Sequence, residues 1–208
     1  MALGATIVAR SAPPLLSTSA AVARGCSPPR STVLAHAGQA RLWRTGDLIG
    51  ACQARDREFH LGLRFNPRDD LGGCIGETIS LPRLSPRYAA WYDDYECDDV
   101  YAATIKRRDL RSGRLLTVPT GHARCPPGCP QVGVGPAVRL LLGRRGVMAW
   151  IALASASSPA SYEVWELDRA GARRLAASDG VDPRYLRLTR HIVRWRESGH
   201  IQTARLVG

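Results

Sequence analysis

The sequence predicts an all-β fold, organised as a propeller-like array of about four small antiparallel sheets. Strand patterns follow one another along the chain, and helical periodicity is never sustained beyond a turn or two. A phrase also recurs, in which an apolar strand and a short turn lead to a second strand ending in tryptophan: Trp43, Trp91, Trp150 and Trp195. Successive tryptophans are 48, 59 and 45 residues apart, and a four-stranded propeller blade repeats about every 40 to 50 residues. Units of this length cannot bury both faces alone, so each is expected to stack on its neighbour.

The first two units are predicted from short apolar runs separated by Gly and Asp turn residues. In the first unit, residues 32–66, we expect strands at 32–35, 40–44, 48–53 and 58–63. A loop rich in Asn, Pro, Asp and Gly separates it from the second unit, residues 79–119. In that second unit we expect strands at 79–84, 88–92, 100–110 and 114–118, with an acidic loop at 93–99.

The last two units repeat this order. In the third unit, residues 137–178, we expect strands at 138–142, 147–153, 162–167 and 173–176. The fourth unit, residues 184–207, holds strands at 185–188, 192–195 and 201–207, and its fourth strand is missing. Either the strand at 32–35 pairs into the last unit and closes a small ring, or the units form an open stack. Exposed strand edges are a liability in a soluble protein, so we expect closure.

Two turns have a clear mechanism. Each runs from an Asp to a Gly, at Asp109–Gly113 and at Asp168–Gly171. An Asp side chain bonds its own backbone two residues on, and Gly supplies the positive φ that closes a hairpin. These turns are therefore expected to join the third and fourth strands of the second and third units.

Two segments resemble known repeats. Leu84-Ser-Pro-Arg-Tyr-Ala-Ala-Trp91 resembles the strand-turn phrase of TolB-like and WD40-like β-propeller repeats, and residues 162–175 resemble their second strand pair with its Asp-to-Gly turn. The resemblance covers residues 79–206, and 32–63 more faintly. The Asp-Gly of the first turn is absent, and only one unit has the Ser-Pro. The chain is also similar to exported β-propeller-like proteins of high-GC actinobacteria, a resemblance that implies an architecture and no activity.

Residues 1–25 are typical of a targeting segment. Arg10 is followed by Leu15-Leu16 and by the small residues Ala21-Val22-Ala23, as in a signal peptide cleaved after Ala23. The apolar region is short and broken by prolines and hydroxyl residues, so a disordered tail is the alternative. The repeat domain is then residues 26–208, and the signal reading predicts an extracytoplasmic protein, secreted or in the cell envelope.

The cysteines form an even set of six: Cys26, Cys52, Cys74, Cys97, Cys125 and Cys129. An even count behind an export signal predicts disulfides in an oxidising compartment. Fifteen connectivities are possible; we prefer the pairs Cys26–Cys52, Cys74–Cys97 and Cys125–Cys129. Zinc at Cys125-Pro-Pro-Gly-Cys129 is the alternative, but no second cysteine or histidine pair accompanies it.

The chain is strongly basic, with a formal net charge of +11 and a pI near 10.1. Lys106 is the only lysine among 29 Lys and Arg residues, and the arginines are spread along the whole sequence. A solvated basic surface explains this better than a nucleic-acid site, which clusters its basic residues with exposed aromatic platforms. No stretch reaches the roughly 18 apolar residues of a membrane span.

Two further groups of residues are candidate binding sites. Calcium takes six to eight oxygen ligands, and carboxylates are densest at Asp93, Asp94, Glu96, Asp98 and Asp99. Their spacing lacks the EF-hand pattern, so we expect a solvated acidic loop and neither a metal nor a cofactor. The four tryptophans occupy the same place in each unit, which favours packing between units; only if exposed would they form a surface for stacking on sugars.

Catalysis finds little support, because no nucleophile or phosphate-binding motif occurs and the histidines are scattered: His36, His60, His122, His191 and His200. We therefore predict a non-enzymatic, exported binding or structural module with a protein or polysaccharide ligand. Its contact surfaces are expected at loops 93–99 and 120–135. The alternatives are a binder of anionic polymers, whether nucleic acid or acidic polysaccharide, and an enzyme with a site at the propeller mouth. A second copy of the chain could complete an open ring.

Overall fold

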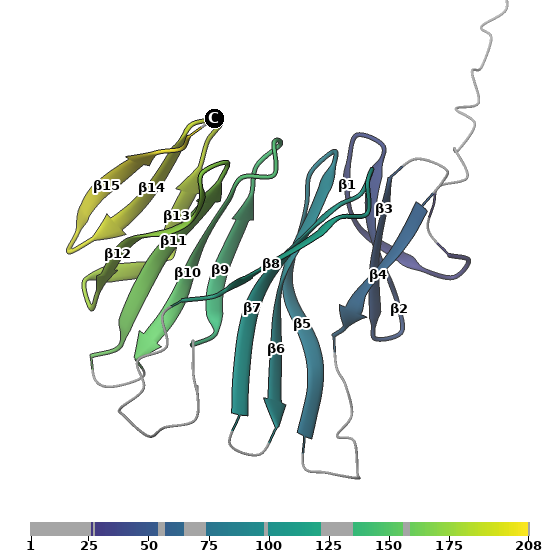
Figure 1. The fold of residues 1–208 in the computed structure, drawn as a ribbon, viewed down its shortest axis with the longest axis horizontal. Coiled ribbons are helices and arrows are strands. Elements are labelled where there is room, and N and C mark those ends of the chain that lie inside the picture. Colours follow the sequence, from purple (N-terminus) through teal and green to yellow (C-terminus); the bar gives the residue numbers. More distant parts are fainter. Residues whose placement is uncertain are drawn as a thin grey trace, which may run out of the picture.

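The computed structural model describes residues 26, 28–53, 57–64, 74–97, 100–121, 135–155 and 159–207. Within these residues it is built from fifteen β-strands in sheets of eight, four and three strands, and no helix occurs in them (Figure 1). The all-β prediction is therefore confirmed. Several hairpins close through tight turns with a glycine at positive φ, such as Gly38, Gly46 and Gly146.

The first sheet holds eight strands in sequence order, β1 to β8. They are β1 (Thr32–Ala37), β2 (Ala40–Thr45), β3 (Leu48–Gln53), β4 (Arg57–Leu63), β5 (Cys74–Leu84), β6 (Tyr88–Cys97), β7 (Val100–Asp109) and β8 (Leu115–Pro119). The second sheet has the order β12-β11-β10-β9, with β9 (Ala137–Leu142), β10 (Met148–Ser155), β11 (Ser161–Asp168) and β12 (Gly171–Ser178). The third contains β13 (Val181–Leu188), β14 (Ile192–Glu197) and β15 (His200–Arg205), so the last group lacks a fourth strand as predicted.

The predicted array of four small antiparallel sheets is wrong. β4 pairs in parallel with β5, through Leu63 and Thr78, and this pairing merges the first eight strands into one mixed sheet. The pairing is possible because β5 begins at Cys74, whereas the sequence pattern placed its start at Ile79. The apolar pattern used for the prediction begins only at Ile79. The prediction therefore left out residues 74–78 of β5, which include the residue that pairs with β4.

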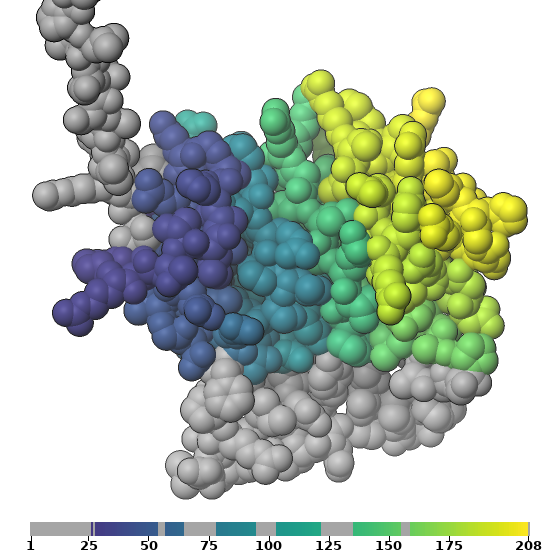
Figure 2. Space-filling view, turned by 180° about the vertical axis from the view of Figure 1, so that it is seen from behind, coloured from purple at the N-terminus to yellow at the C-terminus, as the bar shows by residue number. Residues whose placement is uncertain are grey.

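The predicted closure into a ring is also wrong. β1 pairs with β2, its neighbour along the chain, and the first and last strand groups stand at opposite ends of the molecule (Figure 1). A hairpin joined by a two-residue turn costs far less chain entropy than a pairing between the two ends of the chain. Seen from behind, the strand groups follow one another across the molecule in sequence order (Figure 2).

Three apolar clusters lie between successive layers of strands. The two halves of the eight-stranded sheet pack on each other through residues such as Leu42, Ile49 and Trp91. The second cluster joins β6 and β7 to the second sheet, and the third joins the second sheet to β13 and β14. Adjacent residues of a strand face opposite ways, so Trp150 enters the second cluster and Ile151 the third. β10 is thus buried on both faces, which explains its nearly continuous apolar sequence.

The four repeat tryptophans lie on β2, β6, β10 and β14, and none is more than 6% exposed. Trp91, Trp150 and Trp195 belong to the three clusters between layers. Trp43 belongs to none of them: its indole lies over Gly50 and edge-on to His60, with ring centroids 6.0 Å apart. A Cβ at Gly50 would come 2.0 Å from this ring, which explains a glycine in the middle of β3.

The cysteine pair Cys26–Cys52 forms a disulfide, so this prediction is confirmed. It ties the chain before β1 to the buried strand β3. The backbone register of β5 and β6 makes Cys74 and Cys97 direct partners across the hairpin, the placement that the second preferred pair requires. Cys125 and Cys129 lie outside the described residues.

Candidate anion-binding groove

Two cavities of about 590 and 290 Å³ lie where the turns of the second and third sheets meet the C-terminal segment. Arg145, Val147 and Arg190 line both cavities, so we treat the two as one groove. We call it the basic groove, and it is lined by Arg107, residues 142–145, Val147, residues 168–169, residues 188–191, Leu206 and Val207.

One wall is the turn between β9 and β10. The Gly146 N–H donates to the Gly143 carbonyl at 3.0 Å, and the Gly143 N–H donates to the Val147 carbonyl at 2.8 Å. Gly146 has a φ of 81°, which glycine adopts without the steric cost that other residues incur. Arg144 and Arg145 occupy the two central positions of this turn, and both are exposed.

The opposite wall is the turn between β13 and β14, which carries Thr189, Arg190 and His191. It is closed by a hydrogen bond of 2.9 Å from the Thr189 N–H to the Ile192 carbonyl. The C-terminal segment is fastened beside it, because the Leu206 N–H donates to the His191 carbonyl at 3.0 Å. This segment therefore continues the floor of the groove with apolar side chains.

Arg107 brings the first sheet to the same place. It lies on β7, and its guanidinium donates a hydrogen bond to the Gly146 carbonyl. The same guanidinium stands over the ring of Tyr88, 5.3 Å from its centroid. Burial lowers the pKa of Arg107, although a guanidinium stays charged at any physiological pH. The turn that presents Arg144 and Arg145 is thus held by a partly buried hydrogen bond between two sheets.

The groove carries a large excess of positive charge. Within the described residues, no carboxylate lies within 4.0 Å of Arg144, Arg145, Arg169 or Arg190. The one acid in the lining is Asp168, and its two oxygens accept backbone N–H groups from Ala170 and Val207 at 2.8 and 2.7 Å. Basic side chains that line a concave site over apolar walls focus a positive potential there.

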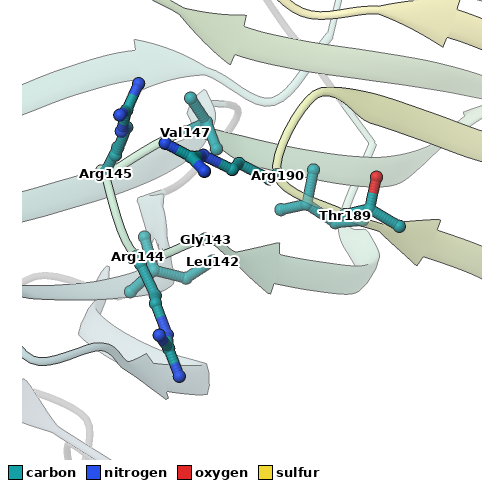
Figure 3. A pocket seen from close by; sticks show the side chains of 8 residues that line it. Leu142, Gly143, Arg144, Arg145, Val147, Thr189 and Arg190 are labelled. Atoms are coloured by element: carbon teal, nitrogen blue, oxygen red, sulfur yellow. The ribbon is translucent and has the colours of Figure 1, made fainter. Parts of the chain in front are cut away.

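The close view shows how the arginines are distributed. Arg190 extends from its turn toward Val147 and Arg145, while Arg144 points to the other side of the β9–β10 turn (Figure 3). Arg169 and His191 line only the smaller cavity. The positive charges are therefore spread along the groove and do not converge on one point. Leu142, Val147 and Leu188 supply apolar surface between them.

The acidic cluster predicted as a loop is for the most part a strand, because β6 continues to Cys97. Asp93 forms an ion pair with Lys106, and Asp94 accepts a hydrogen bond from the Thr78 hydroxyl. Adjacent residues of a strand face opposite ways, so these two carboxylates cannot share one ion. Glu96 also lies on β6, whereas Asp98 and Asp99 lie outside the described residues. In the part of the chain that the structure describes, no three His, Cys, Asp or Glu side chains gather as metal ligands.

The other predicted contact surfaces contribute no described residue to the lining of this groove. Of the loop at 120–135, residues 122–134 lie outside the described residues. Its first residue, Thr120, is buried, and its carbonyl accepts the Trp150 indole N–H. The tryptophans are buried, so they offer no face for sugars. Across the described ranges, no helix has the length and apolar character needed to cross a bilayer.

The sequence reading missed the groove, although a signal was present. The short turn inside the recurring phrase carries Arg144-Arg145 in one unit and Arg190-His191 in the next. The two Asp-to-Gly turns were predicted correctly, and both use the expected mechanism: Asp109 accepts the Arg111 N–H at 2.9 Å, and Asp168 accepts the Ala170 N–H.

Asp109 is the last residue of β7, the strand that carries Arg107, and its carboxyl group gives a prediction about stability in acid. Burial acts to raise the pKa of its carboxyl, but hydrogen bonds from the Arg87 side chain and from the Arg111 and Ser112 N–H groups outweigh burial and lower the pKa from 3.8 to about 2. A carboxylate with a depressed folded-state pKa stabilises the protein above the unfolded-state pKa, and this contribution is lost as the pH falls through the folded-state pKa.

We therefore expect Asp109→Asn to cost about 1 kcal/mol at neutral pH, because Arg87 is half exposed and solvent screens the pair. The cost should shrink between about pH 4 and about pH 2. Urea unfolding of both proteins across this range measures it. A cost that stays constant with pH would contradict the assignment.

Comparison of the chain with protein-family models, with curated proteins and with solved structures gives no match.

Proposed function

We propose that this protein is an exported, non-catalytic binding module that holds an anionic ligand in the basic groove. The observation that carries the proposal is the set of four exposed groove arginines without a carboxylate partner among the described residues. Elsewhere in the molecule, partly buried ion pairs such as Glu163–Arg174 show arginines held by acids in the structure. The four exposed groove arginines have no such acid and line one concave site together, which favours a ligand.

The disulfide supports export. Disulfides persist in oxidising compartments and are rare in the cytosol, and Cys26–Cys52 ties the chain just after the predicted cleavage site to a buried strand. A targeting segment at residues 1–25 is consistent with this location.

The groove chemistry supports binding over catalysis. The Thr189 hydroxyl donates to the Ile192 carbonyl, and Asp168 is occupied by backbone N–H groups. Neither is hydrogen-bonded to a side chain that could act as its base or be activated by it, which a nucleophilic mechanism requires. Arginines are suited to binding an anion, because each guanidinium can donate two parallel hydrogen bonds to a carboxylate, phosphate or sulfate group.

Inorganic polyphosphate tests this function, because it is an anionic chain with no sugar or base. We expect the full chain to bind it with an affinity that falls steeply with added salt. The charge-swap variant Arg145→Glu/Arg190→Glu should lose about tenfold or more in affinity, with a shallower salt dependence.

The matched control is Arg111→Glu/Arg194→Glu, which changes the net charge equally at two exposed arginines outside the groove lining. We expect the control to lose about threefold or less, as a net-charge effect alone would give. Equal losses in the two variants would mean that the surface binds anions without a site, and the proposal would fall.

A further inference from the structure

The arrangement of the groove also indicates which kind of anion it binds. This inference rests on the proposed function. Its arginines are spread over two connected cavities, with Arg144 only in the larger and Arg169 only in the smaller. Arg144 points away from Arg145 and Arg190 (Figure 3). A site for one small anion converges its donors on a point, whereas separated charges match a chain that carries an anionic group on successive units.

The shape of the site argues against a nucleic-acid duplex. A duplex carries its phosphates on a convex surface and is met by elements that enter its grooves. Here the basic side chains line a concave groove of a few hundred Å³ between two turns. Such a groove accommodates one polymer chain.

The lining also argues against single-stranded nucleic acid. Proteins that bind single strands stack the bases on aromatic side chains along a positive groove. No Phe, Tyr or Trp is among the described residues that line this one, and the repeat tryptophans are buried. In their place the groove presents Leu142, Val147 and Leu188 beside the arginines. These aliphatic side chains can contact the C–H groups of sugar rings without the base stacking that a nucleic acid requires.

From the spread of arginines, the concave shape and the aliphatic lining together, we infer that the ligand is a single chain of acidic polysaccharide. Its carboxylate or sulfate groups pair with Arg144, Arg145, Arg190 and Arg169 in turn along the groove. Its sugar rings lie against the aliphatic side chains between them.

The experiment measures binding of the full, disulfide-bonded chain to five fluorescently labelled probes at one pH and one ionic strength. The probes are polygalacturonate fragments with carboxylates, heparin fragments with sulfates, oligo-dT, duplex DNA and neutral dextran. We expect at least one acidic polysaccharide to bind tenfold more tightly than oligo-dT and duplex DNA, and dextran not to bind. Comparison of the first two probes shows whether carboxylate or sulfate is preferred.

Two variants test where the polysaccharide lies along the groove. Arg144→Glu and Arg169→Glu each change one end, and each should weaken a long polysaccharide fragment several-fold. Arg111→Glu, outside the groove, should have little effect, and circular dichroism checks that all three exposed-site variants fold. Oligo-dT or duplex DNA binding as tightly as the polysaccharides would overturn the inference, and so would equal losses for all three variants.

The two proposals can fail separately. If polyphosphate binding depends on Arg145 and Arg190 but no polysaccharide exceeds nucleic acid, the groove is an anion site and only the polysaccharide inference is wrong. If polyphosphate binding is indifferent to both arginines, the proposed function itself is wrong.

Discussion

Replacement of Trp150 by alanine is expected to cost about 5 kcal/mol and to remove much or all of the stability of the fold. Truncation of a buried tryptophan costs about 3 to 5 kcal/mol through lost burial and the cavity left behind. Trp150 is fully buried between the first and second sheets, stacked on Trp165 with centroids 6.0 Å apart and planes 6° apart. Its indole N–H also donates to the Thr120 carbonyl at 2.5 Å, and an unpaired buried carbonyl adds about 1 kcal/mol or more.

A domain is typically stable by only about 5 to 15 kcal/mol, so a loss of this size is a large part of the total. Urea unfolding followed by far-UV circular dichroism measures the loss. Trp150→Phe is the matched control: it keeps an aromatic ring against Trp165 and loses the hydrogen bond, so its cost should be about half. If Trp150→Ala costs less than about 1 kcal/mol, the contact between the two sheets contributes less to the free energy of unfolding than its burial implies.

The same tryptophan illustrates how much of the fold the sequence predicted. Strand identity and most turns followed from local patterns, because a period of two and an Asp-to-Gly turn are determined by residues close together in the chain. The tryptophan spacing predicted four separate sheets, whereas the structure has sheets of eight, four and three strands. It did not reveal that Leu63 and Thr78 join the first two groups, since a single parallel pairing leaves no periodic trace. It also did not reveal whether the two ends of the array meet.

The candidate site was not predicted from the sequence, for a physical reason. A site depends on which turns become neighbours, and the β9–β10 and β13–β14 turns are more than 40 residues apart in the sequence. Only the stacking of the second and third sheets brings Arg145 and Arg190 into one groove. The acidic cluster suggests a metal site because its residues are adjacent in sequence, yet adjacent residues on a strand such as Asp93 and Asp94 face opposite sides of the sheet. Composition identified the excess of arginine without locating it.

Removal of the disulfide in the variant Cys26→Ala/Cys52→Ala is expected to destabilise the protein by about 3.5 kcal/mol. The bond closes a loop with a sequence separation of 26, and the loss of unfolded-chain entropy for a loop of that length is of this order. The loop contains β1, an edge strand whose exposed side chains, Val33 and Leu34 among them, contribute little burial of their own. We expect β1 to be the first element to lose protection from hydrogen exchange in the variant.

The measurement is urea unfolding of the variant beside the native protein with and without reductant, with alkylation and mass spectrometry to count free thiols. A similar loss in the native protein under reductant would assign the effect to the bond, and a larger loss would show that further disulfides contribute. A variant as stable as the native protein would contradict the entropic argument. Thiols of Cys26 and Cys52 that alkylate without reduction, in protein taken from its native compartment, would overturn export and leave the basic groove facing cytoplasmic anions, where nucleic acid is the abundant competitor.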